Sequence, residues 1–186
     1  MLQSRPNALG WTVTPRILYT IGYQGASRDD LIRELAGAGV DLVIDTRETP
    51  TSRRPEFRRR ILEQSLRDAG IAYAWMPDLG VPKPLRRYAR SHRGVFASAY
   101  LQRLRRFNST AEGAAVLALR NSVALLCFES DETECHRSIL AGRLAAISPI
   151  APTHLRVRGR DNADDQPRTP TMVRSQQQMQ VPTRQL

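Results

Sequence analysis

The sequence predicts an α/β domain with a Rossmann-like, open and mainly parallel sheet of about five strands covered by helices. Short apolar segments alternate with amphipathic segments from residue 16 to residue 157, which is typical of a parallel sheet. Residues 122–128 (SVALLCF) are apolar almost without a break, as expected of a strand covered on both faces. The length of 186 residues, with 41% hydrophobic and 25% charged residues, fits one soluble globular domain.

The first strand and helix are predicted within residues 16–39. Residues 16–22 (RILYTIG) are rich in β-forming side chains and end at a glycine, which indicates a buried strand. Ser27 is the expected N-cap of the next helix, whose first turn carries two aspartates that the helix dipole favours. Gly39 then ends the apolar helical periodicity and with it the helix.

Two further strands precede a long helical stretch. Residues 41–46 (DLVIDT) and 71–75 are expected to be strands, and residues 58–69 between them form an amphipathic helix that Gly70 ends. Residues 85–107 are expected to be helical, in one or two arginine-rich pieces.

The remaining elements follow after residue 108. Ser109 and Glu112 match a capping box, which predicts a helix from there to about residue 121. Residues 122–128 form the fourth strand, residues 135–146 a further helix, and residues 153–157 (THLRV) the fifth strand.

The chain divides into a flexible N-terminus at 1–15, one α/β domain at 16–158 and a disordered tail at 159–186. The tail has almost no large apolar residue that could offset the entropy of ordering it. No apolar run reaches the roughly 18 residues of a membrane span, and the start lacks the pattern of a secretory signal. Two cysteines cannot form a disulfide scaffold. We therefore expect a cytoplasmic protein with free thiols and no membrane partner; its oligomeric state is left open.

The positive charge is confined to one region. The chain has 28 basic and 18 acidic residues, a net charge of +10. Residues 47–106 hold 15 of the basic residues and five of the acidic ones, which leaves 13 of each sign in the rest of the chain. All the basic residues except Lys83 are arginine. A regional excess of this kind indicates an anionic partner, whereas an arginine-rich composition would explain only the choice of arginine over lysine.

In an open parallel sheet, ligands bind outside the carboxyl ends of the strands, and the polar residues of this chain gather at those ends. Arginines there could hold phosphate or carboxylate oxygens in bidentate fashion, and the start of the helix at 135–146 suits an anion. The alternative is that Asp45 and one arginine brace each other and the loop. The expected ligand-binding residues are Gly22, Tyr23, Arg47, Ser52, Arg53, Arg54, His136 and Arg137.

Three segments at these strand ends resemble, in order, the motifs of a known family. They are TIGY at 20–23, DTRETPTSRRPEF at 45–57, and LLCFE at 125–129 followed by CHR at 135–137. The middle segment is similar to the pattern D-x-R-x-x-P-x-S-R of the domain of unknown function 488, and the last is similar to its L-L-C-x-E and C-H-R pattern. The resemblance covers about residues 16 to 157 and implies a compact α/β domain without an established reaction.

Three residues are candidates for catalysis: Asp45, Glu129 and Cys135. Cys135 is expected in the first turn of a helix capped by Asp131 or Thr133, where the pKa of a thiol can fall and the thiol can act as a nucleophile. Asp45 and Glu129 stand at strand ends and could act as general acid or base. The structural alternatives are an inert, part-buried thiol and a salt-bridge network of carboxylates with arginines.

No metal ion or other cofactor is expected. Cys127 lies inside an apolar strand and is interpreted as a core residue. Cys127, Cys135 and His136 could ligate a metal by residue type, but the separation between the two cysteines lacks the second closely spaced ligand pair of typical zinc sites.

These observations lead to two main hypotheses and a third, weaker one. In the first, the domain binds a small phosphorylated ligand, such as a nucleotide or nucleoside derivative, at the strand ends. Whether it is an enzyme, a hydrolase or a transferase acting on that ligand, is left open. In the alternative, residues 83–106 provide a basic face for nucleic acid, although no helix-turn-helix, zinc-finger or RNP signature is present. In the third, Cys127 and Cys135 pair as a redox sensor.

Overall fold

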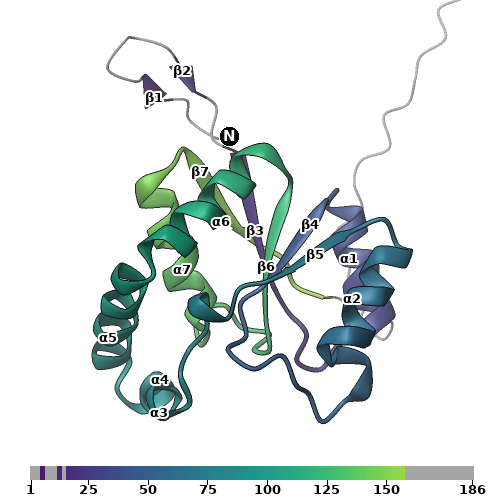
Figure 1. The fold of residues 1–186 in the computed structure, drawn as a ribbon, viewed down its shortest axis with the longest axis horizontal. Coiled ribbons are helices and arrows are strands. Elements are labelled where there is room, and N and C mark those ends of the chain that lie inside the picture. Colours follow the sequence, from purple (N-terminus) through teal and green to yellow (C-terminus); the bar gives the residue numbers. More distant parts are fainter. Residues whose placement is uncertain (1–4, 7–11, 14–15, 158–186) are drawn as a thin grey trace, which may run out of the picture.

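The computed structural model describes residues 5–6, 12–13 and 16–157, and their central feature is a five-stranded, all-parallel sheet. The strand order is β5-β4-β6-β3-β7 (Figure 1). The strands are β3 (Arg16–Gly22), β4 (Leu42–Asp45), β5 (Ala72–Trp75), β6 (Val123–Cys127) and β7 (Ile150–His154). The predicted fold class is thereby confirmed.

The two ends of the chain contribute little to the described structure. A short antiparallel pair, β1 (Arg5–Pro6) with β2 (Thr12–Val13), lies within the segment expected to be a flexible N-terminus. The predicted disordered tail at 159–186 lies outside the described residues. Within the described ranges, no helix is both long and apolar enough to cross a membrane.

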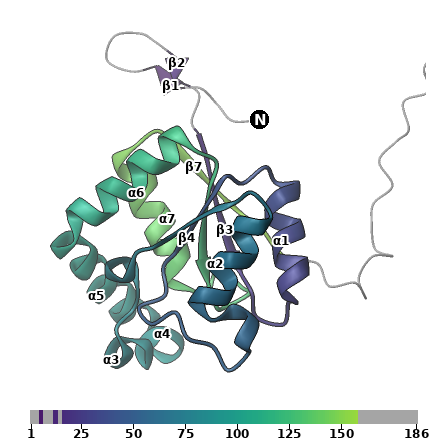
Figure 2. The same ribbon diagram turned by 45° about the vertical axis from the view of Figure 1, so that its right-hand side comes forward.

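Helices cover both faces of the sheet (Figures 1 and 2). Because side chains alternate along each strand, the hydrophobic core is divided into two clusters, one on each face. The first face packs against α1 (Arg28–Gly37) and α2 (Arg59–Asp68). The second face packs against α6 (Asn108–Arg120) and α7 (His136–Ile147), and α5 (Arg93–Arg106) packs on α7.

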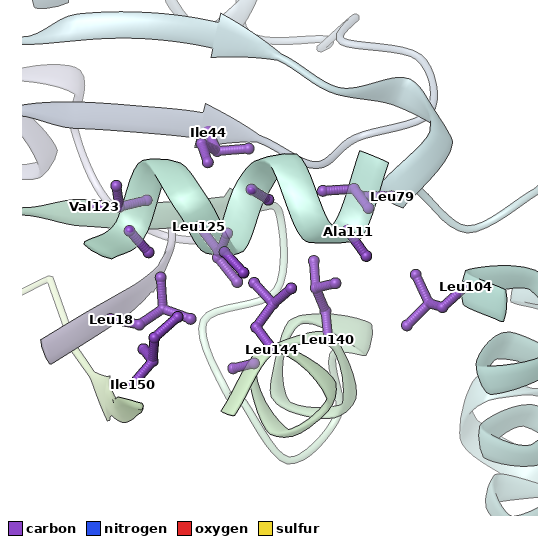
Figure 3. Packing of buried hydrophobic residues seen from close by; sticks show 14 of the residues in the cluster. Leu18, Ile44, Leu79, Leu104, Ala111, Val123, Leu125, Leu140, Leu144 and Ile150 are labelled. Atoms are coloured by element: carbon purple, nitrogen blue, oxygen red, sulfur yellow. The ribbon is translucent and has the colours of Figure 1, made fainter. Parts of the chain in front are cut away.

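Strand β6 shows this division most clearly. Val123 and Leu125 point to the second face and join the cluster drawn in Figure 3, whereas Ala124 and Leu126 point to the first face. All five residues of β6 are buried, which confirms that this strand is covered on both faces. The helix after β6 leads to the second face, and the helices after its neighbours β3 and β4 lead to the first. The carboxyl end of β6 is therefore the switch point at which a ligand site is expected.

The arginine-rich stretch forms three helices, although one or two were expected. These are α3 (Lys83–Arg86), α4 (Tyr88–Ser91) and α5, with a break at His92. Two short 3₁₀ turns, Pro55–Phe57 and Pro77–Leu79, complete the loops after β4 and β5.

Several predicted boundaries need correction. Ser27 caps α1 as expected, since its Oγ accepts from the Asp30 N–H. The predicted capping box is wrong, because α6 begins at Asn108 without a side-chain cap and Ser109 lies inside the helix. Neither Asp131 nor Thr133 caps α7; the N-cap is Cys135.

The last strand lies three residues earlier than predicted, at Ile150–His154 rather than 153–157. Ile150 is buried and pairs with Arg16 of β3. Pro152 is tolerated in this strand because β7 is an edge strand whose outer side needs no donor.

Two glycines allow the loops at the carboxyl edge to approach each other closely. A Cβ on Gly22 would lie 1.7 Å from the carbonyl oxygen of Glu129, so the end of β3 packs directly on the loop after β6. A Cβ on Gly80 would lie 2.4 Å from the backbone nitrogen of Glu48, so the segment before α3 packs on the loop after β4. Both loops around the switch point are thus held at backbone contact distance.

Gly22→Ala is expected to lower the free energy of unfolding by about 1–3 kcal/mol or more, because one backbone segment must move to admit the methyl group. Urea unfolding of both chains measures the loss. The control is Gly113→Ala in the exposed middle of α6, where no atom lies within 4 Å of the added Cβ. That change should stabilise the protein by about 0.5–1 kcal/mol. Equal stability of Gly22→Ala and the parent chain would contradict the close packing.

Candidate functional site

The polar residues at the strand ends form two clusters, one on each face of the sheet. Asp45 and Arg47 are two residues apart and lie on the first face, with α1 and α2. Thr46 points to the opposite face, where it contacts His136 of α7. The sheet therefore separates groups that the sequence placed in a single site.

On the first face, Arg47 is held by protein partners. Its Nε and Nη2 donate to the Asp45 carboxylate at 2.5–3.1 Å. Its Nη1 donates to the Tyr23 hydroxyl and the Phe57 carbonyl oxygen, each at 2.9 Å. Four of the five guanidinium N–H groups are thus used, and the side chain is only 6% exposed.

Asp45 is fully buried and is also shared with Tyr73, whose hydroxyl donates to Oδ2 at 2.6 Å. Burial and the Asp45 charge raise the pKa of Tyr73, which keeps its proton on the oxygen. Burial alone would lower the pKa of Arg47, but the hydrogen bonds and charge of Asp45 raise it. The alternative left open by the sequence, a pair that braces the loop, is therefore present.

Arg137 is a second buried brace. It is fully buried, and its guanidinium donates to Thr20 Oγ1 at 3.2 Å, to the Ser130 carbonyl oxygen at 2.8 Å and to the Glu129 carbonyl oxygen. These bonds tie the loop after β6 to β3 and α7. Arg47 and Arg137 thus hold the two loops that flank the switch point.

On the second face, two thiols, a carboxylate and an imidazole gather at the end of β6. The Sγ atoms of Cys127 and Cys135 lie 3.1 and 3.2 Å from Glu129 Oε2, and 3.6 and 3.7 Å from His136 Nδ1. The four ligand atoms all lie within 4.8 Å of one another. We call these four residues the thiol cluster. They are a set of side chains that could hold a metal ion.

The pKa values of the groups in the thiol cluster shift in opposite directions. Burial opposes the thiolate of Cys135, but hydrogen bonds with Cys127 and His136 and the charges of His136 and Arg137 lower its pKa to about 3. The hydrogen bond with Cys135, together with burial, raises the pKa of Cys127. Burial and the charge of Cys135 raise the pKa of Glu129. These directions favour a thiolate at Cys135 that receives hydrogen bonds from the Cys127 thiol and the Glu129 carboxyl.

Residues that the sequence did not single out orient His136. The Thr46 hydroxyl donates to the Leu126 carbonyl oxygen at 2.9 Å, so its oxygen is free to accept from His136 Nε2 at 3.2 Å. The ring of Tyr100 packs edge-on against His136, with centroids 5.4 Å apart. This network assigns a proton to Nε2 and turns Nδ1 toward the two sulfur atoms.

The sequence contained one signal for this arrangement. The pattern Cys127-x-Glu129 at the end of a strand and Cys135-His136 at the start of the next helix bring four reactive side chains to one edge. Cys127 was interpreted as a core residue because its strand is apolar, and it is indeed buried. Its sulfur nevertheless contacts Glu129 and His136.

The remaining predicted residues lie in the loop between β4 and α2. The Ser52 hydroxyl accepts from the Arg54 N–H at 3.2 Å. Arg54 pairs with Glu56 at 2.8 Å and stacks on Phe57, with its guanidinium carbon 4.6 Å from the ring centroid. Arg53 is exposed. Of the predicted arginines, Arg53 is therefore the one best placed to meet a ligand from solvent.

Arg47→Ala is expected to destabilise the fold by about 3–5 kcal/mol, because it leaves the Asp45 carboxylate buried without its partner. Arg47→Lys should restore only part of the lost stability, since an ammonium group cannot replace the bidentate contact with Asp45. Urea unfolding gives both values. Arg67→Ala removes an exposed ion pair with Glu63 in α2 and should change stability by less than about 1 kcal/mol. Equal effects at the two positions would refute the bracing role.

Comparison with known proteins gives a family but no characterised relative. The model of the family "Domain of unknown function DUF488" matches residues 27–144, which is more than half of the chain. The match includes the thiol cluster, Asp45 and both buried arginines. No curated protein matches the chain. The motifs at the strand ends, the parallel sheet and this match agree, and the chain belongs to the DUF488 family.

Proposed function

We propose that the chain binds a phosphate-bearing ligand, such as a nucleotide or nucleoside derivative, at the carboxyl edge of its sheet. The proposal is supported by five exposed cations on that side of the molecule, which we call the basic rim. Figure 1 shows the loop before α2 and helices α3 and α4 at the same end of the sheet. The basic rim consists of Arg53, Arg58, Lys83, Arg87 and Arg93.

The observation that carries the proposal is a chain of contacts from the thiol cluster to the rim. Thr46 contacts His136 of the cluster. Two residues later, Glu48 accepts from Arg86 of α3, with an N–O distance of 3.3 Å. The loop after β4, which carries Arg53 and Arg58 of the basic rim, therefore contacts both the thiol cluster and α3, the helix that carries Lys83.

Charge supports the same edge. No acidic residue occurs between Asp78 and Glu112, while this segment holds eight basic residues. The positive potential of such a segment attracts anions and raises their local concentration. A phosphate-bearing ligand that reaches the edge would be held by exposed arginines, while the buried Arg47 and Arg137 position the loops beneath it.

If the domain is an enzyme, Glu129 is better placed than Asp45 to react with such a ligand, and the Cys135 thiol lies beside it. Asp45 is fully buried and is shared by Arg47 and Tyr73. Glu129 is only half-buried and shares its carboxyl oxygen with both thiols. In this proposal the Cys135 thiolate displaces the leaving group of the ligand and Glu129 gives that group its proton; water or an acceptor, deprotonated by Glu129, then displaces the sulfur and restores the thiolate.

Nucleic acid is the second candidate ligand, supported by the exposed surface of α5. A shallow groove of about 650 Å³ runs along this helix. Small side chains let a phosphate backbone approach the helix, and the arginines would neutralise its charge. The lining residues are Gly94, Val95, Ser98, Ala99, Gln102 and Arg105.

Binding of a labelled nucleoside triphosphate and of a labelled single-stranded oligonucleotide, each at several salt concentrations, tests the proposal. Arg53→Gln should weaken nucleotide binding about ten- to a hundredfold, the loss expected for one charge-assisted hydrogen bond. The matched control is Arg67→Gln, an exposed arginine of α2 that removes the same charge. An equal loss for both variants would show that only net charge matters and would contradict the site.

The salt dependence separates the two ligands. A polynucleotide that displaces several counterions loses affinity steeply with salt, whereas a nucleotide held at the rim loses less. The variant Arg87→Gln/Arg93→Gln should flatten the oligonucleotide slope if the face of α3–α5 binds nucleic acid. If the nucleotide does not bind and only the oligonucleotide shows a steep slope, the second candidate replaces the first.

A further inference from the structure

We propose that the thiol cluster, Cys127, Glu129, Cys135 and His136, is a binding site for a zinc-class divalent metal ion. Metal binding does not require the phosphate-bearing ligand, because none of the four side chains belongs to the basic rim. It does use Cys135 and Glu129 as metal ligands, whereas the proposed function would use them as reactive groups. It reverses the expectation from sequence spacing that the chain has no metal site.

The spacing of the four ligand atoms fits tetrahedral coordination. Zinc–sulfur distances of about 2.3 Å and zinc–nitrogen or zinc–oxygen distances of about 2.0–2.2 Å place neighbouring ligand atoms about 3.3–3.8 Å apart. The two sulfur atoms lie 3.6 and 3.7 Å from His136 Nδ1, and 3.1 and 3.2 Å from Glu129 Oε2. All four atoms lie within 4.8 Å of one another. Small side-chain rotations would therefore suffice to close the site around an ion.

The ligand types select the class of metal. Two thiolates with an imidazole suit zinc and similar soft or borderline ions, while magnesium and calcium prefer sites built from oxygen. Cys127, Cys135 and His136 are 6%, 1% and 6% exposed. Glu129 is half-buried and is the ligand nearest to solvent. Three of the four ligands are thus buried, and the fourth is one that water or a substrate group could displace.

His136 is held in the orientation that metal binding requires. Its Nε2 donates to Thr46 Oγ1, whose own proton goes to the Leu126 carbonyl oxygen. Nδ1 is therefore the ring nitrogen that faces the two sulfur atoms, where it would bind the ion. Metal-ligating histidines generally donate their second ring N–H to a protein oxygen in this way.

The ligands come from parts of the chain that are rigidly connected. Cys127 ends the central strand β6, and Cys135 is the N-cap of α7. Arg137 ties the loop between them to β3 through the carbonyl oxygens of Glu129 and Ser130. The loop is thus fixed without an ion, so a metal would find the four ligands already assembled.

Cobalt binding to the fully reduced, full-length chain tests the proposal. The chain has two cysteines, so any thiolate-to-cobalt charge-transfer band reports this cluster. We expect one Co²⁺ per chain, intense tetrahedral d–d bands and complete displacement by Zn²⁺. Absence of charge-transfer bands, or weak octahedral bands alone, would overturn the site.

Variants assign the ligands. Cys127→Ser and Cys135→Ser should each weaken cobalt binding more than about a hundredfold, and His136→Ala should do likewise. The matched control is His92→Ala, which removes an exposed histidine from the break before α5. Thr46→Val should lower affinity about 10–100-fold, because it removes the hydrogen bond that orients His136. Unchanged binding in either cysteine variant would refute the assignment.

A measurement on the unmodified chain covers the case in which the variants do not fold. Zn²⁺ should protect both thiols of the reduced protein from a thiol reagent, and a chelator should restore their reactivity. Equal reactivity with and without Zn²⁺ would exclude the metal site. Arg53→Gln should bind cobalt like the parent chain, so failure of the anion proposal and failure of the metal proposal are distinguishable.

Discussion

The alternation of side chains along two central strands determines on which face of the sheet the groups at their carboxyl ends lie. Because successive residues of a strand point to opposite faces, Asp45 and Arg47 lie on the face of α1 and α2, while Thr46 and Cys127 lie on the face of α7. A shift of one residue in the register would exchange the two sets. The apolar residues of β6, buried on both faces, prevent such a shift.

Two buried arginines turn this arrangement into a rigid edge. Arg47 donates to the Asp45 carboxylate and to the Phe57 carbonyl oxygen. Arg137 donates to the carbonyl oxygens of Glu129 and Ser130. Each arginine thus supplies hydrogen bonds to acceptors at the end of a central strand and in the loop that follows it. Burying a charge is unfavourable unless it is paired and hydrogen-bonded, so these contacts are strongly interdependent. The strand-end arginines at the two central loops therefore support the loops, and the exposed arginines are the ones proposed to meet a ligand.

The thiol cluster and the basic rim use the same edge in different ways. The cluster is buried on the α7 face and offers sulfur, nitrogen and oxygen ligands within a few ångströms, which suits a small cation. The rim is exposed and offers only cations, which suits an anion. Thr46 and Glu48 lie in the loop after β4; Thr46 contacts the cluster, and Glu48 contacts α3, which carries Lys83 of the rim. A metal ion beneath the rim would add positive charge at the position where the phosphate-bearing ligand is proposed to bind.

The sequence by itself determined the fold class, the capped start of α1 and the edge at which the reactive residues gather. Those features depend on local periodicity and on the parallel order of the strands, which neighbouring residues encode. Only the tertiary structure decided that Arg47 and Arg137 are buried braces, and that Cys127 joins Cys135 and His136. Their partners lie far away in sequence or on another element, such as Tyr23 for Arg47 and Thr20 for Arg137. The spacing of the two cysteines in the sequence argued against a metal site. Their distance through space is short, because α7 begins beside the carboxyl end of β6.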